Sequence, residues 1–281
     1  MRGAIVSGLA IALLVVGCAG QQETSTESAE SPTAAAQAQG PEAATDDGDG
    51  TMVVTYQDAS SPEAVNGRAL LQDNTVLEDL AADINESLIL PYDIALIGAE
   101  CGEANAYWDP AEDSITICYE DADGALATFT ADGVPDPTAA MLNSEIATFY
   151  HEVGHMAISI YDLPITGREE DVADQLAAYV LLQPGDDGRP DPEAVQAVKD
   201  FARTFQEGDS GELGAEDFAD THSFGETRAY NLQCWIYGAD PDANADLVGD
   251  GGLPQDRADG CEDEYTQLDN AWSTLLEPHL K

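Results

Sequence analysis

Apolar residues recur at helical spacing in the middle of the chain. Over residues 138–161 they follow one another at intervals of three to five positions, which fits a helix better than a strand; they are Met141, Ile146, Phe149, Val153, Met156 and Ile160. Pro164 ends the pattern, because proline lacks the backbone N–H that a helix needs. The spacing therefore predicts one long helix over residues 138–161.

A second helix is expected soon after this proline. The sequence TGRE has the capping-box pattern, with Thr166 as the N-cap and Glu169 three positions later. This pattern predicts a helix over residues 167–182. Further helices are predicted for residues 191–206, 224–237 and 262–276.

The segment before these helices is rich in β-forming residues. It contains two short runs joined by the turn-forming sequence DPAED, which predicts a β-hairpin. With a turn near Pro110, Cys101 and Cys118 fall on opposite arms and nearly face each other, so we expect them to form a disulfide. Cys234 and Cys261 would then form the second disulfide.

The start of the chain has the pattern of an export signal. One arginine is followed by an apolar run that is short for a membrane span, and then by VVGC. We expect a signal peptide over residues 1–17. The VVGC sequence resembles a bacterial lipobox, which implies a lipid on Cys18 that anchors the exported protein to a membrane of the cell envelope. The alternative is an ordinary signal peptide followed by an incidental cysteine.

The next segment is expected to be a tether. Residues 19–50 contain no aromatic residue and no aliphatic residue larger than alanine, so they cannot bury enough apolar surface to offset the entropy lost on ordering. We therefore expect a lipidated cysteine and disordered tether over residues 18–51, and one globular domain over residues 52–281. The four cysteines of that domain, an even number, agree with an exported protein.

The charge of the chain is strongly acidic. Its formal net charge is -46, and only seven of its 55 acidic residues lie in the tether. The folded domain is therefore acidic itself. Binding to nucleic acid or to an anionic lipid surface through charge is excluded, because both need a basic surface.

The sequence HEVGH lies within the long predicted helix. Positions four apart share one face of a helix, so His151 and His155 can both direct an imidazole nitrogen at one Zn²⁺. Glu152 can take a proton from a water that the metal activates. The alternative is a chance motif in a buried polar patch. With only four histidines in the chain, we favour the metal site.

A third protein ligand is expected from the next helix. Glu170 and Asp174 are four positions apart and so share a face. We expect Glu170 to bind the metal and Asp174 to accept the second ring N–H of a ligand histidine. Glu169 is expected to support the site at the helix start, and it is the alternative third ligand.

This arrangement looks like that of the zincin metallopeptidases whose third ligand is a glutamate on a later helix. Several segments together are similar to a bacterial family of exported metallopeptidases: ECGEANAYWDPAEDSITICYE, HEVGH, LPITGREEDVADQLA, RAYNLQCWIYGADP and LPQDRADGCEDEYTQLDNAWSTLLEPHL. The resemblance extends over most of residues 56–279, and HExxH with GREED is its most specific part. It implies an α+β, zincin-like fold, with a small sheet and edge hairpin packed on the HExxH helix, several further helices, and zinc-dependent hydrolysis.

Two further features are expected around the metal. The arm DSITICYE is placed to be an edge strand that pairs with extended substrate. A donor is also needed for the oxygen that becomes negative when water adds to a carbonyl group. His222 and Arg228 are the leading candidates, followed by Tyr230. Of the first two, Arg228 is expected to have a structural role, which leaves His222 as the preferred donor.

The leading hypothesis is a zinc metallopeptidase, tethered to a membrane by its lipid, that acts on a peptide or protein. One alternative is a non-catalytic, zinc-containing envelope lipoprotein that binds a peptide or a partner. Another is an amidase that acts on cell-wall material. The intact Glu152 favours an enzyme, because a purely structural zinc site has no need of a carboxylate beside its first ligand.

Overall fold

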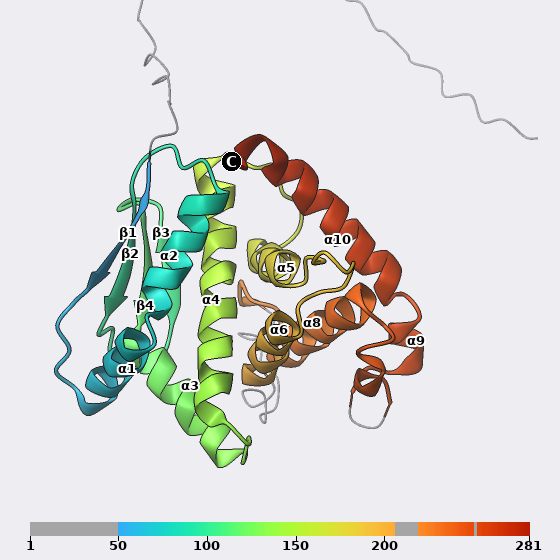
Figure 1. Ribbon diagram of the computed structural model, residues 1–281, viewed down its shortest axis with the longest axis horizontal. Helices are drawn as coiled ribbons and strands as arrows, with labels where there is room; N and C mark the ends of the chain where they lie inside the picture. The colour runs from blue at the N-terminus through green and yellow to red at the C-terminus, as the bar shows by residue number, and fades with distance from the viewer. Residues whose placement is uncertain (1–49, 206–218, 250–251) are drawn as a thin grey trace, which may run out of the picture. The chain divides into compact units, whose positions relative to one another are not determined.

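A four-stranded sheet with a long helix beside it organises the fold (Figure 1). The computed structural model describes residues 50–205, 219–249 and 252–281. The strands lie in the order β1, β2, β4, β3, and β1, β2 and β4 are parallel while β3 is antiparallel to β4. Their bounds are Met52–Tyr56 for β1, Ile94–Ala99 for β2, Ala106–Asp109 for β3 and Ser114–Cys118 for β4.

The predicted hairpin is present, but its edge strand is the other arm. Every residue of β4 is buried, because β4 pairs with β2 on one side and with β3 on the other. Burial on both faces of a strand is typical of the interior of a covered sheet. The expectation that DSITICYE forms the edge was therefore wrong, and Ala106–Asp109, which is only partly buried, forms it instead.

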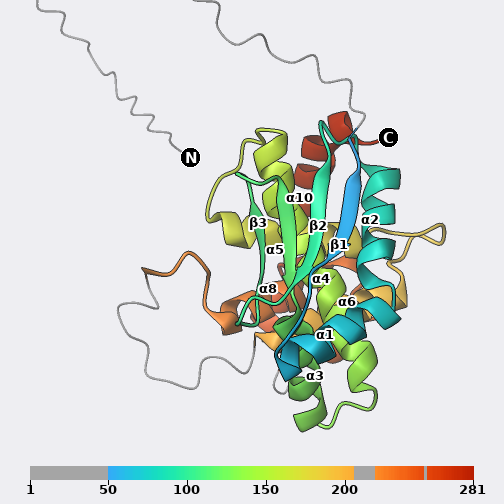
Figure 2. The same ribbon diagram turned by 90° about the vertical axis from the view of Figure 1, so that its left-hand side faces the viewer.

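The helices gather on one side of the sheet (Figures 1 and 2). Helix α4 packs against β3, β4 and α3 with one part of its surface, and against α5 and α6 with another. It therefore lies between the sheet and the C-terminal helices. The bounds of the α-helices are Pro62–Asp73 for α1, Val76–Ser87 for α2, Tyr119–Ala131 for α3, Pro137–Ile160 for α4, Glu169–Leu181 for α5, Pro192–Thr204 for α6, Gly225–Ala239 for α8, Gln255–Ala258 for α9 and Cys261–Leu276 for α10.

The long predicted helix is confirmed as α4, displaced by one residue at each end. Its N-cap is Asp136, whose carboxylate accepts a hydrogen bond from the backbone N–H of Ala139 at 3.0 Å. Helices α6, α8 and α10 also occupy the predicted segments. The observed architecture is thus a mixed α/β fold with a small sheet.

The predicted capping box at the start of α5 is not formed. The helix begins at Glu169 with Arg168 as its N-cap, and no side chain caps it. The backbone at Gly167 has a φ of 101°, a conformation that side-chain-bearing residues rarely adopt. Thr166 therefore stands outside the helix, and the side chain of Glu169 is free to reach another partner.

Both disulfides have the predicted pairing. Cys101 joins Cys118 and Cys234 joins Cys261. The reason for the first pair differs from the one expected, because Cys118 pairs in register with Ala99 of the neighbouring parallel strand. Cys101, two residues beyond Ala99, thus reaches Cys118 from the end of β2 and not from across the hairpin.

The expected signal peptide (1–17), the lipid site at Cys18 and residues 18–49 of the expected tether lie outside the described residues. All the residues that the structure describes belong to one compact unit, Thr45–Lys281. None of the helices in the described ranges has the length and apolar character needed to cross a membrane.

Candidate metal centre

The two histidines of HEVGH project from one face of α4. His151 is buried, with 6% of its surface exposed, and its ring centroid lies 4.9 Å from that of His155. Gly154 lies between them in the sequence at the contact with α5. A Cβ atom on Gly154 would lie 2.8 Å from the Cα of Ala173. The absence of a side chain therefore lets α5 approach α4 closely enough to bring its acidic first turn to the histidines.

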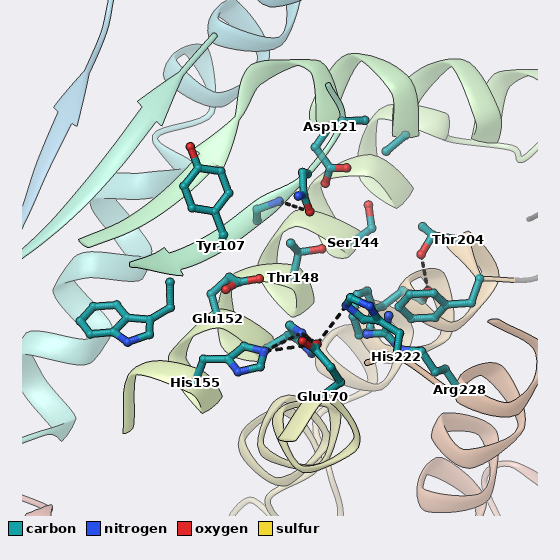
Figure 3. A pocket seen from close by; sticks show the side chains of 18 of the residues that line it. Tyr107, Asp121, Ser144, Thr148, Glu152, His155, Glu170, Thr204, His222 and Arg228 are labelled. Atoms are coloured by element: carbon teal, nitrogen blue, oxygen red, sulfur yellow. Dashed lines mark hydrogen bonds and ion pairs between the residues drawn. The ribbon is translucent and has the colours of Figure 1, made fainter. Parts of the chain in front are cut away.

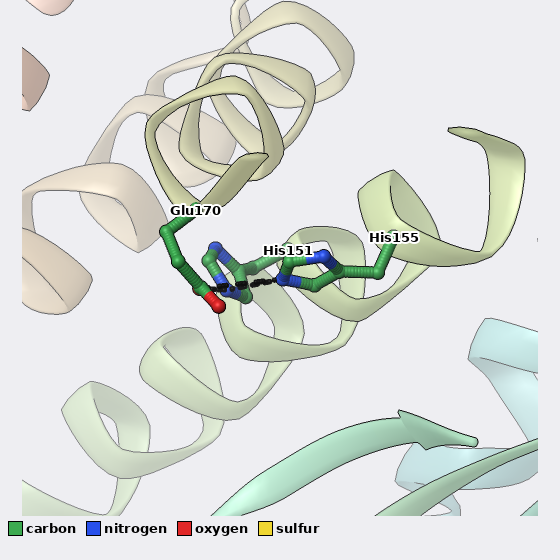
Figure 4. A group of neighbouring side chains, drawn as sticks. All are labelled: His151, His155 and Glu170. Carbon is green, nitrogen blue, oxygen red and sulfur yellow. Dashed lines mark hydrogen bonds and ion pairs between the residues drawn. The ribbon is translucent and has the colours of Figure 1, made fainter. Parts of the chain in front are cut away.

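Three ligand atoms form an almost equilateral triangle (Figure 4). The Nε2 atoms of His151 and His155 are 3.3 Å apart, and Oε2 of Glu170 lies 3.2 Å from the first and 3.3 Å from the second. In a tetrahedral zinc site with metal–ligand bonds of about 2.0–2.1 Å, neighbouring ligand atoms are about 3.3 Å apart. The residues present therefore fit a zinc ion with three protein ligands, and the grouping of His151, His155 and Glu170 agrees with the predicted set.

The charges of these groups are strongly coupled. Burial opposes the charged form of His151, but hydrogen bonds to Asp174 and Glu170 outweigh it and raise the pKa of His151 to about 9. Burial likewise opposes the charged form of Glu170, yet hydrogen bonds from both histidines hold the pKa of Glu170 far below its usual range. Protons on the histidines thus supply positive charge beside Glu170, and a metal ion held by the three ligand atoms would take their place.

Asp174 connects the centre to Arg228. Oδ1 of Asp174 lies 2.8 Å from Nδ1 of His151, and the guanidinium group of Arg228 donates to both carboxylate oxygens at 2.7 Å. Burial raises the pKa of Asp174, but the hydrogen bonds from Arg228 and His151 outweigh it, and the net shift is downward. Arg228 also lies over the ring of Phe205, 3.9 Å from its centroid. Its role in the structure is to hold the carboxylate that orients His151.

Glu169 does the same for the other histidine. Its Oε1 lies 2.9 Å from Nδ1 of His155, so each imidazole has a carboxylate on the nitrogen that faces away from the triangle. Because an ionised carboxylate can only accept a hydrogen bond, both Nδ1 atoms carry a proton. Each histidine would therefore bind a metal through Nε2, after losing the proton that Nε2 donates to Glu170. Glu169 supports the site through His155 instead of capping the helix.

Glu152 is buried next to the triangle. Only 5% of its surface is exposed, and its side chain lines the same cleft as His151 and His155 (Figure 3). Burial raises the pKa of Glu152, although the two histidines and the backbone of Trp108 act in the opposite direction. A carboxylate whose pKa is raised by burial is suited to accept and release a proton near neutral pH.

His222 lies at the rim of the centre. Its Nε2 is 3.1 Å from Oε2 of Glu170, and its Nδ1 is 3.0 Å from Oδ1 of Asp220. Arg168 donates to the backbone carbonyl of His222 at 2.7 Å. The leading choice for an oxyanion donor thus stands beside the ligands, whereas Tyr230 does not line the cleft.

The cleft has a volume of about 1020 Å³ and extends beyond the ligands along α4. The edge strand β3 contributes one wall through residues that include Tyr107 and Trp108. At the end toward α3 it is lined by Asp121 and Ser144 (Figure 3). Sequence reasoning missed this end, which includes the buried Glu145 behind it. A signal was present, since Glu145 falls four positions after Met141, on the apolar stripe of the helix.

A buried carboxylate beside two histidines and a glutamate that converge on one point is the arrangement of a metal-dependent hydrolase. The chain belongs to the family DUF4344, described as "Putative metallopeptidase", which matches residues 56–276. No curated protein and no solved structure matches the chain. The family places the protein among metallopeptidases.

Proposed function

We propose that the protein is a zinc-dependent peptidase with a zincin-like fold. The observation that supports this proposal best is the ligand triangle with edges of 3.2–3.3 Å in the same cleft as the buried Glu152. Two imidazole nitrogens and one carboxylate oxygen, with a fourth side facing a cleft, form the ligand set of a catalytic zinc site. Harder ions such as Mg²⁺ favour sites made of oxygen ligands.

When bound, zinc would supply Lewis acidity that polarises the carbonyl group under attack and lowers the pKa of water in the site. Glu152 would accept the proton of the attacking water on its carboxylate and deliver it to the nitrogen of the leaving amine. No covalent intermediate with the protein is needed. His222, next to Glu170, would donate from its ring to the carbonyl oxygen as negative charge develops there.

The edge strand is the proposed docking site for the peptide backbone. Within the described residues β3 pairs only with β4, so its other side has backbone groups that can receive a further strand. Its residues Ala106, Tyr107 and Trp108 line the cleft. An extended substrate added to this edge would run past Glu152 and the ligand triangle.

Substitution of Glu152 by glutamine tests the proposal. The Glu152→Gln protein should retain one equivalent of zinc by elemental analysis and lose peptide hydrolysis by about 10²–10⁴-fold. His151→Ala should lose the zinc as well. The exposed Glu226→Gln, on α8, is the matched control and should change neither property. If Glu152→Gln and the wild-type protein both bind peptide with zinc present and neither hydrolyses any amide, the non-catalytic lipoprotein is the better interpretation. Cleavage of cell-wall amides without cleavage of peptides would support the amidase.

We also propose that the protein is exported and held on the cell envelope by a lipid on Cys18. The lipobox-like VVGC sequence and the two disulfides support this location. Cys18→Ala should abolish incorporation of labelled fatty acid and release the protein from the membrane fraction. Retention of the label in that variant would contradict the proposal.

A further inference from the structure

Two carboxyl groups meet at the end of the cleft that the metal centre does not occupy. Glu145, on α4, has 1% of its surface exposed, and neither of its oxygens receives a hydrogen bond from a donor among the described residues. The polar group next to it is the carboxyl group of Asp121 on α3. Asp121 lines the cleft, and its side chain extends from α3 into the pocket (Figure 3).

The pKa shifts of the two carboxyl groups favour one proton shared between them. Burial raises the pKa of Glu145 well above its usual value, and the neighbouring Asp121 raises it further. Burial also raises the pKa of Asp121, whereas its hydrogen bond with Glu145 lowers it. The pKa of Asp121 is raised on balance, but the pKa of Glu145 is raised further, which favours Glu145 as the group that holds a proton between the two. Of the two carboxyl groups, only that of Asp121 lines the cleft, while Glu145 is buried behind it.

The part of the chain that the structure describes provides no basic partner for this pair. No salt bridge or hydrogen bond joins Asp121 or Glu145 to a Lys, Arg or His side chain there, and the guanidinium groups that make ion pairs have other partners, such as Asp174 for Arg228 and Asp58 for Arg68. A carboxylate in a partly desolvated cleft gains most from a cation that can approach it closely. That cation would have to come from the ligand in the cleft.

The distance to the metal centre suits a side chain of a bound peptide. Glu145 precedes His151 by six residues on α4, which corresponds to about 9 Å along the helix axis. An extended peptide advances about 3.3 Å per residue, so a residue one to three positions from the scissile bond would stand near Asp121. Small side chains line this part of the cleft, among them Ser144, Thr148 and Ala125.

We propose that Asp121, backed by Glu145, forms a subsite for the lysine or arginine side chain of a peptide substrate. This proposal rests on the proposed peptidase function, and it specifies the substrate class as basic peptides. An ammonium or guanidinium group can be bound by one carboxylate and nearby hydroxyl groups. Calcium fits less well, because it takes six to eight oxygen ligands. The acidic surface of the protein, with a formal net charge of -46, would also draw basic peptides toward the cleft.

Peptide binding to the full mature Glu152→Gln protein with zinc tests the subsite without turnover. The probes are short peptides in which one lysine is moved along an otherwise neutral sequence, each paired with the same peptide carrying norleucine. Calorimetry should give a dissociation constant at least about ten-fold lower for lysine than for norleucine at one position, the gain expected of a charge-assisted hydrogen bond. At other positions the two peptides of each pair should bind within a few-fold of each other.

A second substitution locates the effect. Asp121→Asn, added to the same protein, should remove the preference for lysine at that position. Asp123→Asn is the matched control: Asp123 lies on the same helix and accepts a hydrogen bond from Asn66 outside the cleft, so the preference should persist. Because the preference is measured first without any change at Asp121, poor folding of Asp121→Asn would not prevent the test.

Two outcomes would overturn the proposal. Equal affinity for lysine and norleucine peptides at every position would show that the carboxyl pair only joins α3 to α4. Stoichiometric binding of Ca²⁺ that depends on Asp121, with no gain from lysine, would show a metal site instead. Failure of the peptidase proposal would appear differently, as absence of hydrolysis by the wild-type protein with zinc bound, whatever the preference for lysine.

Discussion

The carboxylate of Asp174 accepts a hydrogen bond from Nδ1 of His151 at 2.8 Å while two nitrogens of Arg228 donate to it at 2.7 Å. One acidic side chain thus orients a histidine that could bind a metal, and it is itself held by the buried guanidinium group of Arg228. Loss of such a partner of a ligand histidine typically weakens metal binding by about 10–100-fold.

Replacement of Asp174 by asparagine should weaken zinc binding by about 10–100-fold. The amide would leave Nδ1 of His151 without a charged acceptor and Arg228 without its counter-charge. Loss of a buried ion-pair partner should also lower the free energy of unfolding by about 3–5 kcal/mol. Competition with a zinc chelator and urea denaturation measure the two effects. Asp73→Asn, at the exposed end of α1, serves as the control, and equal zinc affinities for the two variants would contradict the assigned role of Asp174.

Glu169 provides a test between helix capping and support of the metal site. Because its Oε1 lies 2.9 Å from Nδ1 of His155 and no side chain caps α5, Glu169→Ala should reduce zinc affinity by about 10-fold. The free energy of unfolding of the metal-free protein should change by less than about 1 kcal/mol, since no capping bond is lost. Thr166→Ala should leave both quantities unchanged. A larger effect of Thr166→Ala than of Glu169→Ala on stability would restore the capping interpretation.

Gly154 sets the distance between the helices that carry the ligands. A methyl group there would lie 2.8 Å from the Cα of Ala173, so α5 would have to move away from α4. Gly154→Ala should therefore destabilise the fold by about 1–3 kcal/mol and weaken zinc binding as Glu170 recedes.

The matched control for Gly154 is Gly124, which lies within α3. A Cβ atom there would meet only the Cβ of Ala104, at 3.9 Å. Gly124→Ala should be neutral or should stabilise the protein by up to about 1 kcal/mol, because alanine favours a helix. Thermal unfolding of both variants gives the comparison. Similar losses of stability in the two variants would mean that the close contact of Gly154 between α4 and α5 does not determine the stability of the fold.

The sequence was most informative where a periodic pattern and the chemistry agreed. The two histidines and Glu170 could be placed together because helical spacing fixes which residues share a face, and the next helix was expected to follow after Pro164. The contacts of Glu169 could not be obtained in this way. Its TGRE pattern is a local signal, whereas its hydrogen bond to His155 depends on the close approach of α4 and α5.

The strand order shows a similar limit. Local propensity predicted the hairpin, but it does not tell which arm pairs with a third strand. Continuous burial of Ser114–Cys118 follows from its parallel pairing with Ile94–Ala99, a contact between segments that are distant in the chain. Glu145 was missed for a different reason, because an acid within an apolar stripe was treated as part of a generally acidic composition.

Glu145 should make the protein less stable as pH rises, whereas an acid whose pKa is lowered by folding makes a protein more stable as pH rises. Its pKa in the folded protein is raised well above the ordinary value of 4.5, so at a pH between these two values the folded state keeps a proton that the unfolded state has lost. Stability must then fall as pH rises through that interval, by up to about 1.4 kcal/mol per pH unit.

Glu145→Gln removes this titration and keeps the size and a donor for Asp121. The free energy of unfolding of the variant, minus that of the wild type, should therefore increase from about pH 4.5 upward and level off once Glu145 ionises in the folded wild-type protein. Urea denaturation of both proteins across this range measures the difference. A difference that stays constant with pH would mean that Glu145 ionises in the folded protein at its ordinary pKa. The inference that Glu145 and Asp121 share a proton would then be wrong.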